Sequence, residues 1–199
     1  MPRQMFLRCV SVAALLAVVG FGGPAVAVGG EFTGNVNFLL GQKMLNDKDW
    51  EPLENQPEFG AEITWGDSSW PISIATDIFY SKDDGEDDSG NDLDGSTMEF
   101  DLGIREIKNT ENFYYYIGLG FGLVSAEAEA TLSGTKFDDS DTGISGWGGG
   151  GIFWRLGSRF NVGLAARYSV ADVTLFDEDV RAGGFHYGVI LGWGWPGSK

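Results

Sequence analysis

The stretch FYYYIGLGFGLV, residues 113–124, carries an aromatic or aliphatic side chain at every odd position, whereas its even positions run Tyr, Tyr, Gly, Gly, Gly and Val. Side chains alternate between the two faces of a strand, so one face of this stretch is bulky and the other nearly bare. If the bulky face were buried, the glycines would face water, where they weaken a strand and contribute no packing. If the bulky face meets lipid, the glycines line a narrow interior where other side chains need room.

The same two-residue alternation recurs along the chain, with turn residues between the runs, and no stretch after residue 27 sustains a helical period. We therefore expect an all-β protein of eight strands, an even number that suits a closed antiparallel barrel. The expected strands run roughly over Phe32–Gly41, Pro57–Gly66, Trp70–Tyr80, Ser96–Ile107, Asn112–Leu132, Lys136–Leu156, Arg159–Val173 and Gly184–Trp195.

Short and long connections alternate between these strands. Residues 66–69, 108–111 and 157–158 are tight turns, and the connections between them are long and polar. This alternation places all tight turns at one end of the barrel and all long loops at the other, as in outer-membrane barrels. A soluble Greek-key sandwich rarely sorts its loops in this way.

The strand faces differ in charge as well as in bulk. One series of alternate positions is bulky and uncharged, and the other contains the charged strand residues together with most strand glycines. The charged positions are Glu58, Glu62, Asp77, Glu99, Asp101, Arg105, Arg155, Arg167 and His186. We predict that they form a polar network in the lumen of an up-and-down transmembrane barrel, where opposite charges pair or keep water. A lipocalin-like secreted barrel would instead place the apolar series inside.

Tryptophans cluster at the tight-turn end of the expected barrel, where membrane barrels carry aromatic girdles. The predicted girdle consists of Trp65, Trp70, Trp154, Trp193 and Trp195. The sixth strand fits less well, because residues 148–151 are all glycine and Trp147 falls on the inward-facing series. A β-bulge there would shift Trp147 outward.

The first residues have the features of a secretory signal. Arg3 and Arg8 precede an apolar run over residues 10–22, and Ala25-Val26-Ala27 is a small-residue cleavage site. A membrane-spanning helix would need about 20 apolar residues and flanking stop-transfer charges. We therefore predict that residues 1–27 are removed, together with the single cysteine, and that residues 28–199 form one barrel domain exported to the outer membrane.

The formal net charge of −16 becomes more negative when two arginines leave with the signal. This charge argues against nucleic acid as a partner and favours cations or basic surfaces. Aromatic residues make up 14% of the chain, a content that is unlike a disordered protein and predicts a folded one.

With these features the chain resembles the small eight-stranded outer-membrane proteins, such as the OmpA barrel domain and the OmpX/Ail group. The closing stretch GGFHYGVILGWGW, residues 183–195, ends in aromatics as those proteins do. The resemblance implies a monomer in lipid and lipopolysaccharide, insertion by the barrel assembly machinery, and loops that reach an extracellular protein partner. Those proteins usually end on the aromatic residue, whereas here residues 196–199 follow it, which puts recognition by the assembly machinery in question.

The second long loop, residues 81–95, is the most acidic part of the chain. Its carboxylates are Asp83, Asp84, Glu86, Asp87, Asp88, Asp92 and Asp94. Such a segment can take up Ca²⁺ or Mg²⁺ weakly, or share the divalent ions that bridge lipopolysaccharide phosphates. Its spacing does not match an EF-hand, so a solvated acidic loop without metal is the alternative. We expect no other cofactor.

The third long loop continues the alternation, since alanines over residues 126–130 alternate with Glu127 and Glu129. It is either a flexible loop or a protruding hairpin whose strand edge binds partners. His186, the only histidine, shares the inward face with Ser169 of the neighbouring strand. Lipid A-modifying barrels use such a pair, but on the lipid-exposed face.

The expected function is therefore non-enzymatic, in envelope structure, adhesion or surface recognition. The alternatives are a lipid A-modifying enzyme, a narrow channel for small hydrophobic solutes, and a secreted lipocalin-like binder. An open pore is not expected, because eight strands leave an interior just wide enough for side chains.

Overall fold

The computed structural model describes residues 31–87, 89–132 and 134–195. The predicted signal over residues 1–27, Asp88 and the tail over residues 196–199 lie outside the described residues. Among the described residues, no helix is long and apolar enough to cross a membrane.

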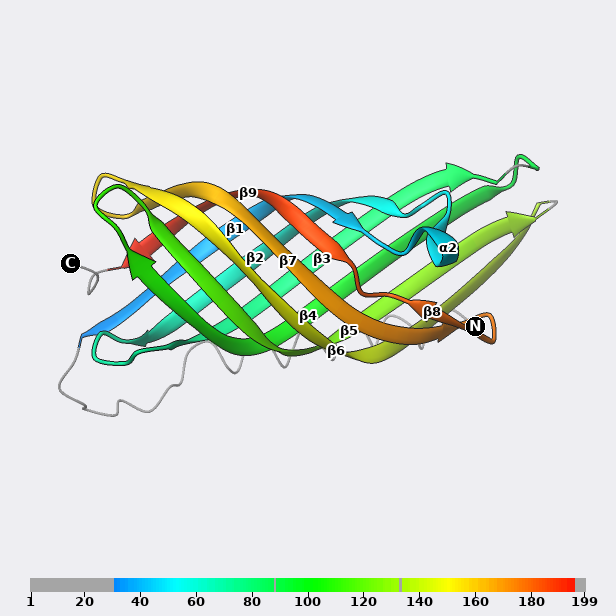
Figure 1. Ribbon diagram of the computed structural model, residues 1–199. Helices are drawn as coiled ribbons and strands as arrows, with labels where there is room; N and C mark the ends of the chain where they lie inside the picture. The colour runs from blue at the N-terminus through cyan, green and yellow to red at the C-terminus, as the bar shows by residue number, and fades with distance from the viewer. Residues whose placement is uncertain (1–30, 88, 133, 196–199) are drawn as a thin grey trace, which may run out of the picture. The chain divides into compact units, whose positions relative to one another are not determined.

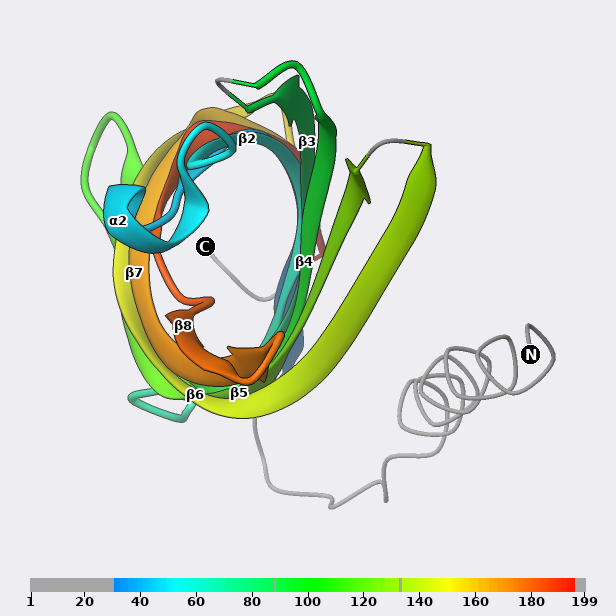
Figure 2. The same ribbon diagram turned by 90° about the vertical axis from the view of Figure 1, so that its right-hand side faces the viewer.

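The described part of the chain contains nine strands and one short helix. They are β1 (Phe32–Met44), α2 (Asp47–Trp50), β2 (Asn55–Asp67), β3 (Ser73–Glu86), β4 (Asp92–Asn109), β5 (Tyr114–Leu132), β6 (Thr135–Leu156), β7 (Phe160–Leu175), β8 (Glu178–Arg181) and β9 (Phe185–Trp195). Eight of these strands, all but β8, form a ring of antiparallel pairs that β6 closes against β7 and β9 closes against β1. The predicted eight-stranded up-and-down barrel is confirmed (Figures 1 and 2).

We call the end of the barrel with the tight turns its lower end and the end with the long connections its upper, or outer, end. The lower part of the wall is apolar on its outside. In β5, Ile117, Leu119 and Phe121 point outward, and 75% of the Phe121 side chain is exposed. Tyr116, on the opposite face of the same strand, is buried. The outward series of the other barrel strands is likewise exposed and apolar, as Phe38, Leu102 and Leu191 show. A lipocalin arrangement, with the apolar series inside, is therefore not what this chain adopts.

Strands β3 to β6 continue beyond the ring at the end where the long connections lie (Figure 1). The pairing of β2 with β3 stops at Glu58 and Ser81, and that of β6 with β7 stops at Ser145 and Ala171. Beyond these pairs, the backbones of β3 to β6 are paired in register only with one another. We call this four-stranded extension, residues 82–86, 92–97, 126–132 and 135–142, the protruding sheet.

The protruding sheet differs from what the sequence predicted for the second long connection, and it shows which of two alternatives holds for the third. The irregular acidic loop expected over residues 81–95 is wrong at both ends, because β3 runs to Glu86 and β4 begins at Asp92. Lys82 pairs with Ser96 and Glu86 with Asp92, so backbone pairing orders most of the segment. Of the two alternatives for the third connection, the structure shows the hairpin, paired up to Leu132 and Thr135.

The remaining long connections fold over the outer opening of the barrel. The connection between β1 and β2 contains α2, and the one between β7 and β9 contains β8, which pairs with the end of β7. Seen from this end, α2 and β8 lie across the rim, while the hairpins of β3–β4 and β5–β6 stand out from it (Figure 2). Neither α2 nor β8 was expected, because each is only four residues long.

The sixth strand keeps its register without a bulge, and Trp147 lies inside the barrel. The glycine face of the neighbouring strands provides the room for this indole. An added Cβ on Gly103 would lie 2.7 Å from Trp147 Cζ2, and one on Gly118 would lie 3.3 Å from its Cη2. Gly118 of the quoted stretch therefore leaves room for a tryptophan from β6, and Gly122 lies against Asp101 and Ser145 of the neighbouring strands.

Candidate functional site: the lumen network and the outer cap

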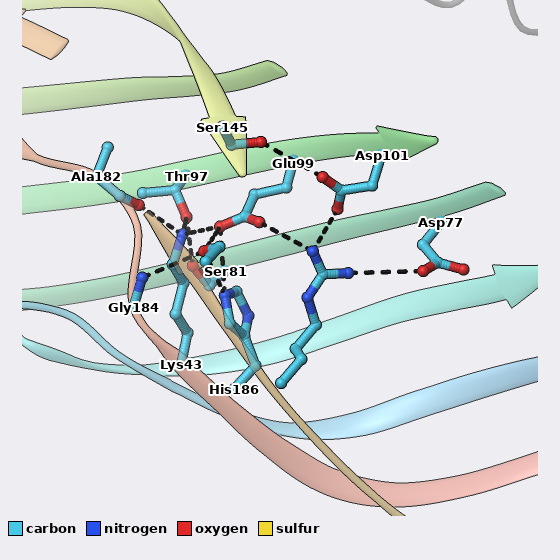
Figure 3. Close-up of polar contacts among 12 residues, drawn as sticks. Lys43, Asp77, Ser81, Thr97, Glu99, Asp101, Ser145, Ala182, Gly184 and His186 are labelled. Atoms are coloured by element: carbon cyan, nitrogen blue, oxygen red, sulfur yellow. Dashed lines mark hydrogen bonds and ion pairs between the residues drawn. The ribbon is translucent and has the colours of Figure 1, made fainter. Parts of the chain in front are cut away.

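The outer end of the lumen is organised by a lysine. Lys43 of β1 is fully buried, and its Nζ donates to Thr97 Oγ1 at 2.7 Å, Glu99 Oε1 at 2.5 Å and the carbonyl of Ala182 at 2.8 Å (Figure 3). These three acceptors come from β4 and from the connection before β9. Lys43 therefore ties one wall of the barrel to the opposite one.

Beside the lysine, His186 links its own strand, β9, to β2, β4 and β7. Its Nδ1 lies 2.6 Å from Glu58 Oε1, and its Nε2 lies 3.0 Å from Ser169 Oγ and 3.3 Å from Glu99 Oε1. Ser169 Oγ donates to Glu99 Oε1 at 3.1 Å. The serine, histidine and carboxylate are thus in mutual contact, but only 1% of Ser169 is exposed, so no substrate carbonyl reaches its hydroxyl in this structure.

The centre of the lumen is built around two arginines. Arg167 donates to Asp101 Oδ2 at 2.7 Å, with its guanidinium stacked between the rings of Phe79 and Trp147. Arg105 donates to Asp77 Oδ2 at 2.9 Å. A second contact of 3.6 Å joins Arg167 to the same Asp77 oxygen, so both arginines share this buried carboxylate. Such fixed, delocalised cations suit buried ion pairs.

Toward the tight-turn end the network becomes less charged. The guanidinium of Arg105 also lies 3.5 Å from Glu62 Oε1, and Tyr116 donates its hydroxyl to the other Glu62 oxygen at 2.7 Å. Arg155 donates to Asn161 Oδ1 at 3.0 Å and to Asn35 Oδ1 at 2.7 Å. The structure therefore places all nine predicted lumen residues inside the barrel and brings them together in successive layers.

The lumen charges nearly balance, and the network closes the barrel. Its described members are five carboxylates, three arginines, Lys43 and His186. A cavity beside Arg105 and Tyr116 has a volume of only about 10 Å³, roughly what one water needs.

Sequence reasoning missed Lys43, because the first strand was expected to end at Gly41. The signal was present: alternate positions from Asn35 and Asn37 lead through Gly41 to Lys43 on the inward face. Uncharged members such as Thr97 and Ser81, which hydrogen-bond to each other at 2.8 Å, were missed because hydroxyl residues occur on both faces of strands.

Above the lumen network the interior changes character. The residues that fill the outer end are apolar and come from β5, β7 and the connections that fold over the opening. This outer cap consists of Leu45, Trp50, Val124, Ala126, Ala171, Val173, Leu175 and Ala182, with Ala128 and Val180 packed against it. Trp50 Nε1 donates to the carbonyl of Arg181 at 2.8 Å, which fastens α2 to the end of β8.

The acidic segment lies on the protruding sheet and its turn. Asp83 shares the inward-facing series with Ser81, while Asp84, Glu86, Asp92 and Asp94 face outward. Lys82 pairs with Asp94 at 2.7 Å on the exposed face. Among the described residues, which leave out Asp88, no group of three His, Cys, Asp or Glu side chains is arranged to hold a metal ion.

Asp87 organises the turn between β3 and β4. Its carboxylate accepts from the side chain of Asn91 at 2.8 Å, from the backbone of Asn91 at 2.9 Å and from the backbone of Ser89 at 2.8 Å. The hydrogen bonds from Asn91 lower the pKa of Asp87 below its ordinary value. This carboxylate is thus engaged with its own turn.

The five predicted girdle tryptophans lie at the end with the tight turns. Gly34 of β1 pairs with both Trp65 and Trp195, which places these two tryptophans on either side of β1. The other three are exposed on the outside, namely Trp70, Trp154 and Trp193. Their headgroup-level role stays a prediction.

No family model matches the chain, and no curated protein matches it. Solved structures do match. Ail, the attachment invasion locus protein of Yersinia pestis, in complex with the heparin analogue sucrose octasulfate, is 14% identical with a TM-score of 0.55, over 84% of this chain and 100% of that chain. A major outer membrane protein from Thermus thermophilus is 8% identical with a TM-score of 0.56, over 82% and 98% of the two chains. The outer membrane protein OprG from Pseudomonas aeruginosa is 14% identical with a TM-score of 0.52, over 83% and 96%.

The fold is that of a small outer-membrane β-barrel. The predicted architectural resemblance is confirmed, and the apolar outer band of the wall is the surface that such barrels turn toward lipid. At these identities the likeness extends to the fold and not to what each protein binds.

Proposed function

We propose that this protein is an integral outer-membrane protein that works by display: a closed barrel anchors the chain and holds an acidic, four-stranded sheet outside the membrane. The observation that carries the proposal is that β3 to β6 continue, fully paired, beyond the apolar band. Outer-membrane location, monomeric state and insertion by the assembly machinery are parts of this proposal.

The packed lumen supports display over transport. Arg105, Arg167 and Lys43 span the interior at successive levels, each bonded to a buried carboxylate. Opening a path would require separating these pairs in a low-dielectric interior, which is costly. The lumen network therefore suits a rigid support for the outer end.

The edges of the protruding sheet suit an extracellular protein partner. Above Ser81, β3 is no longer paired with β2. Above Ser145 the backbone of β6 is no longer paired with β7, although the side chains of Asp139 and Asp141 accept amides of the β7–β8 turn and of β7. Unpaired strand edges offer backbone donors and acceptors to an added strand. The side chains along these edges, such as Asp84 and Asp138, are acidic and would favour a basic partner.

The outward carboxylates also suit a role in envelope stability. Asp84, Glu86 and Asp92 lie on the outside of the sheet, toward the tip of the β3–β4 hairpin. The described residues form no metal cage of their own, so divalent ions would be shared with lipopolysaccharide phosphates. The expected consequence is that chelation with EDTA loosens the contact between the sheet and the lipopolysaccharide surface.

Cell fractionation with a heat-modifiable gel shift tests the anchoring part of the proposal. The folded protein should fractionate with outer-membrane markers and migrate differently before and after boiling. Recovery in the soluble periplasm or culture medium, without detergent, would instead support a secreted binder.

A shortened variant tests the display part. Replacing residues 84–92 and 128–139 by two-residue turns removes most of the protruding sheet and leaves the barrel pairs below it intact. We expect the heat-modifiable shift to persist while binding of expressing cells to matrix-coated surfaces is lost. Unchanged binding would contradict display by this sheet, and discrete conductance steps of the wild type in planar bilayers, or uptake of small hydrophobic solutes, would favour a channel.

A second candidate function rests on the contact chain from Ser169 through His186 to Glu58. These residue types in this order form nucleophile, base and orienting group in hydrolases. The burial of Ser169 opposes this function, since a lipid A acyl chain has no access to the hydroxyl. The discriminating measurement is the lipid A mass spectrum of cells carrying His186→Ala or Ser169→Ala, which the display function predicts to be unchanged.

A further inference from the structure

A cavity of about 300 Å³ opens at the outer end of the barrel, between α2, β8 and the protruding sheet. Its apolar lining comes from separate connections: Trp50 and Leu53 follow β1, Leu93 and Ala128 belong to the protruding sheet, and Val180 belongs to β8. The outer cap forms its base. This volume is at the small end of ligand pockets, roughly 300–1,000 Å³.

The cavity lies above the apolar band, on the inner face of the protruding sheet. Along β5 that face remains apolar up to the tip, where Leu132 and the neighbouring Phe137 are exposed, whereas Asp83, Asp139 and Asp141 lie on the same face of β3 and β6. An apolar concavity open to the outside of the cell, beyond the membrane, faces water. Apolar surface of this kind marks interaction sites on soluble parts of proteins.

The rim of the cavity carries charge of one sign. Asp49, Glu51 and Glu178 line it, and among its described lining residues there is no Lys or Arg. Asp49 accepts a backbone hydrogen bond from Arg181, whereas no ion pair among the described residues engages the carboxylate of Glu51 or Glu178. An apolar base within an acidic rim is complementary to an apolar side chain flanked by cationic ones.

A strained turn holds one aromatic ring at the mouth. Phe176 and Asp177 form the two-residue turn between β7 and β8, and both have positive φ, 52° and 65°. Glycine, asparagine and aspartate are the residues that favour such a turn, whereas a phenylalanine there is strained. Phe176 lines the cavity and is 49% exposed, and its amide donates to Asp139 Oδ2 at 2.6 Å. Strain of this kind concentrates at ligand-binding positions.

We propose that this cavity binds a short basic peptide segment, which inserts one bulky apolar side chain between Trp50, Phe176 and Val180 and places flanking Lys or Arg side chains against the acidic rim. The inference rests on the proposed display function and names the chemistry of the partner. The volume suits one or two side chains, and the acidic rim disfavours polyanions such as the one bound to Ail.

The test uses the full mature chain, folded in zwitterionic nanodiscs, and the probe peptide acetyl-Gly-Lys-Trp-Lys-Gly-amide. Amide chemical shifts should move in a saturable way, with the largest changes at Leu93, Ala128 and Val180. Two control peptides separate the contribution of the apolar side chain from that of the flanking charges. One has serine in place of tryptophan and lacks the apolar anchor, and the other has glutamate in place of both lysines and carries the opposite charge. Both controls should fail to saturate.

Two matched variants separate a built pocket from diffuse attraction. Glu51→Gln with Glu178→Gln removes two rim charges, and we expect about fivefold weaker binding of the probe. Glu127→Gln with Asp172→Asn removes the same charge from outward positions of β5 and β7 that do not line the cavity, and we expect less than about twofold change. Equal losses in the two variants, or equal binding of the serine peptide, would overturn the proposal, as would no shift at all near the cavity.

Phe176→Asn separates binding from folding. Asparagine relieves the strained turn, so we expect resistance to urea to be unchanged or higher while the probe binds several-fold more weakly. Full retention of binding would exclude the ring from the site. Failure of the probe experiment leaves the adhesion assay of the shortened variant unaffected, so the two proposals fail separately.

Discussion

Strand β5 carries two opposite arrangements along its length. In its lower half the outward residues Ile117, Leu119 and Phe121 are apolar and the inward ones are glycine or buried tyrosine. In its upper half the outward positions include Glu127 and Glu129, and the inward ones are alanines. Side chains keep alternating without interruption along β5, so its register is unchanged and only its surroundings differ.

The other strands change at the same level. The last outward apolar residue is Met98 in β4, Ile144 in β6 and Val170 in β7, and the next outward positions are Ser96, Thr142 and Asp172. The paired register joins these positions into a continuous line across β4 to β7. This line is where we place the outer boundary of the lipid.

The contrast between the two halves of β5 explains why the interior of the barrel is polar below the lipid boundary and apolar above it. At membrane level lipid accepts any apolar side chain, so the lumen contains the polar groups, and paired charges fill it. Above the boundary the outside is wet, and the protruding sheet, which no longer closes into a ring, gains its stability by burying apolar surface under the cap. The cap and the lumen network meet where Lys43 donates to Ala182.

The largest expected effect comes from breaking a lumen pair. Arg167→Met keeps most of the packing between Phe79 and Trp147 but leaves Asp101 buried without its cation. We expect a loss of about 3–5 kcal/mol in the free energy of unfolding, measured by urea titration in lipid vesicles. Adding Asp101→Asn should recover part of the loss. A single-variant loss below about 1 kcal/mol would contradict a charge-paired lumen.

A smaller effect is expected from filling the bare face. Gly103→Ala would place a Cβ 2.7 Å from Trp147 Cζ2 and closer still to the backbone of β5, so we expect a loss of about 1–3 kcal/mol. Gly146 faces outward with no atom within 4 Å of a built Cβ, and Gly146→Ala is the matched control with little expected effect. Equal losses at the two positions would mean that the glycines serve strand flexibility and not space.

The smallest effect concerns pH and the protruding sheet. Asp141 accepts the amide of Thr174 at 2.8 Å, and this hydrogen bond lowers the pKa of Asp141. A lowered folded-state pKa means that the contribution is fully present above the unfolded value of about 3.9 and is lost as pH falls through the folded value. Hydrogen exchange of the Thr174 amide should therefore lose protection only below about pH 4, and Asp141→Asn should remove that dependence. A midpoint near neutrality would exclude this assignment.

Much of the fold could be predicted because alternate residues of a barrel strand face lipid and lumen, so that the two faces can be read from the sequence. Eight runs of alternation and the sorted turns were sufficient for the architecture, and the charged series identified nine lumen residues. The upper halves of β3 and β4 were not predicted, because aspartate and glycine are poor strand formers and common turn residues. Cross-strand pairing and the buried Gly95, which lies against Trp50 and Leu53, hold them in strand instead.

The candidate site was less predictable than the wall. Lys43 lies two residues after Gly41, and a glycine at that place indicates the end of a strand. The cavity is formed by α2, β8 and the protruding sheet together, and the sequence does not show how the connections between the strands bring these elements into contact. The reversal in β5 could have been found, since Leu123 and Ser125 are the outward residues on either side of it. Following the outward residues of β5 from Tyr115 to Thr131 would have located the lipid boundary, because they change from apolar to polar between Leu123 and Ser125.

Arginine substitution along the outward face of β5 tests the account most directly. Leu119, Phe121, Leu123, Ser125 and Glu127 are replaced one at a time, and the free energy of unfolding is measured in lipid vesicles. The account predicts a loss of about 2–4 kcal/mol at Leu119 and Phe121, falling to about 0–1 kcal/mol at Ser125 and Glu127. A uniform loss at all five positions, or none at Phe121, would contradict a lipid boundary between Leu123 and Ser125.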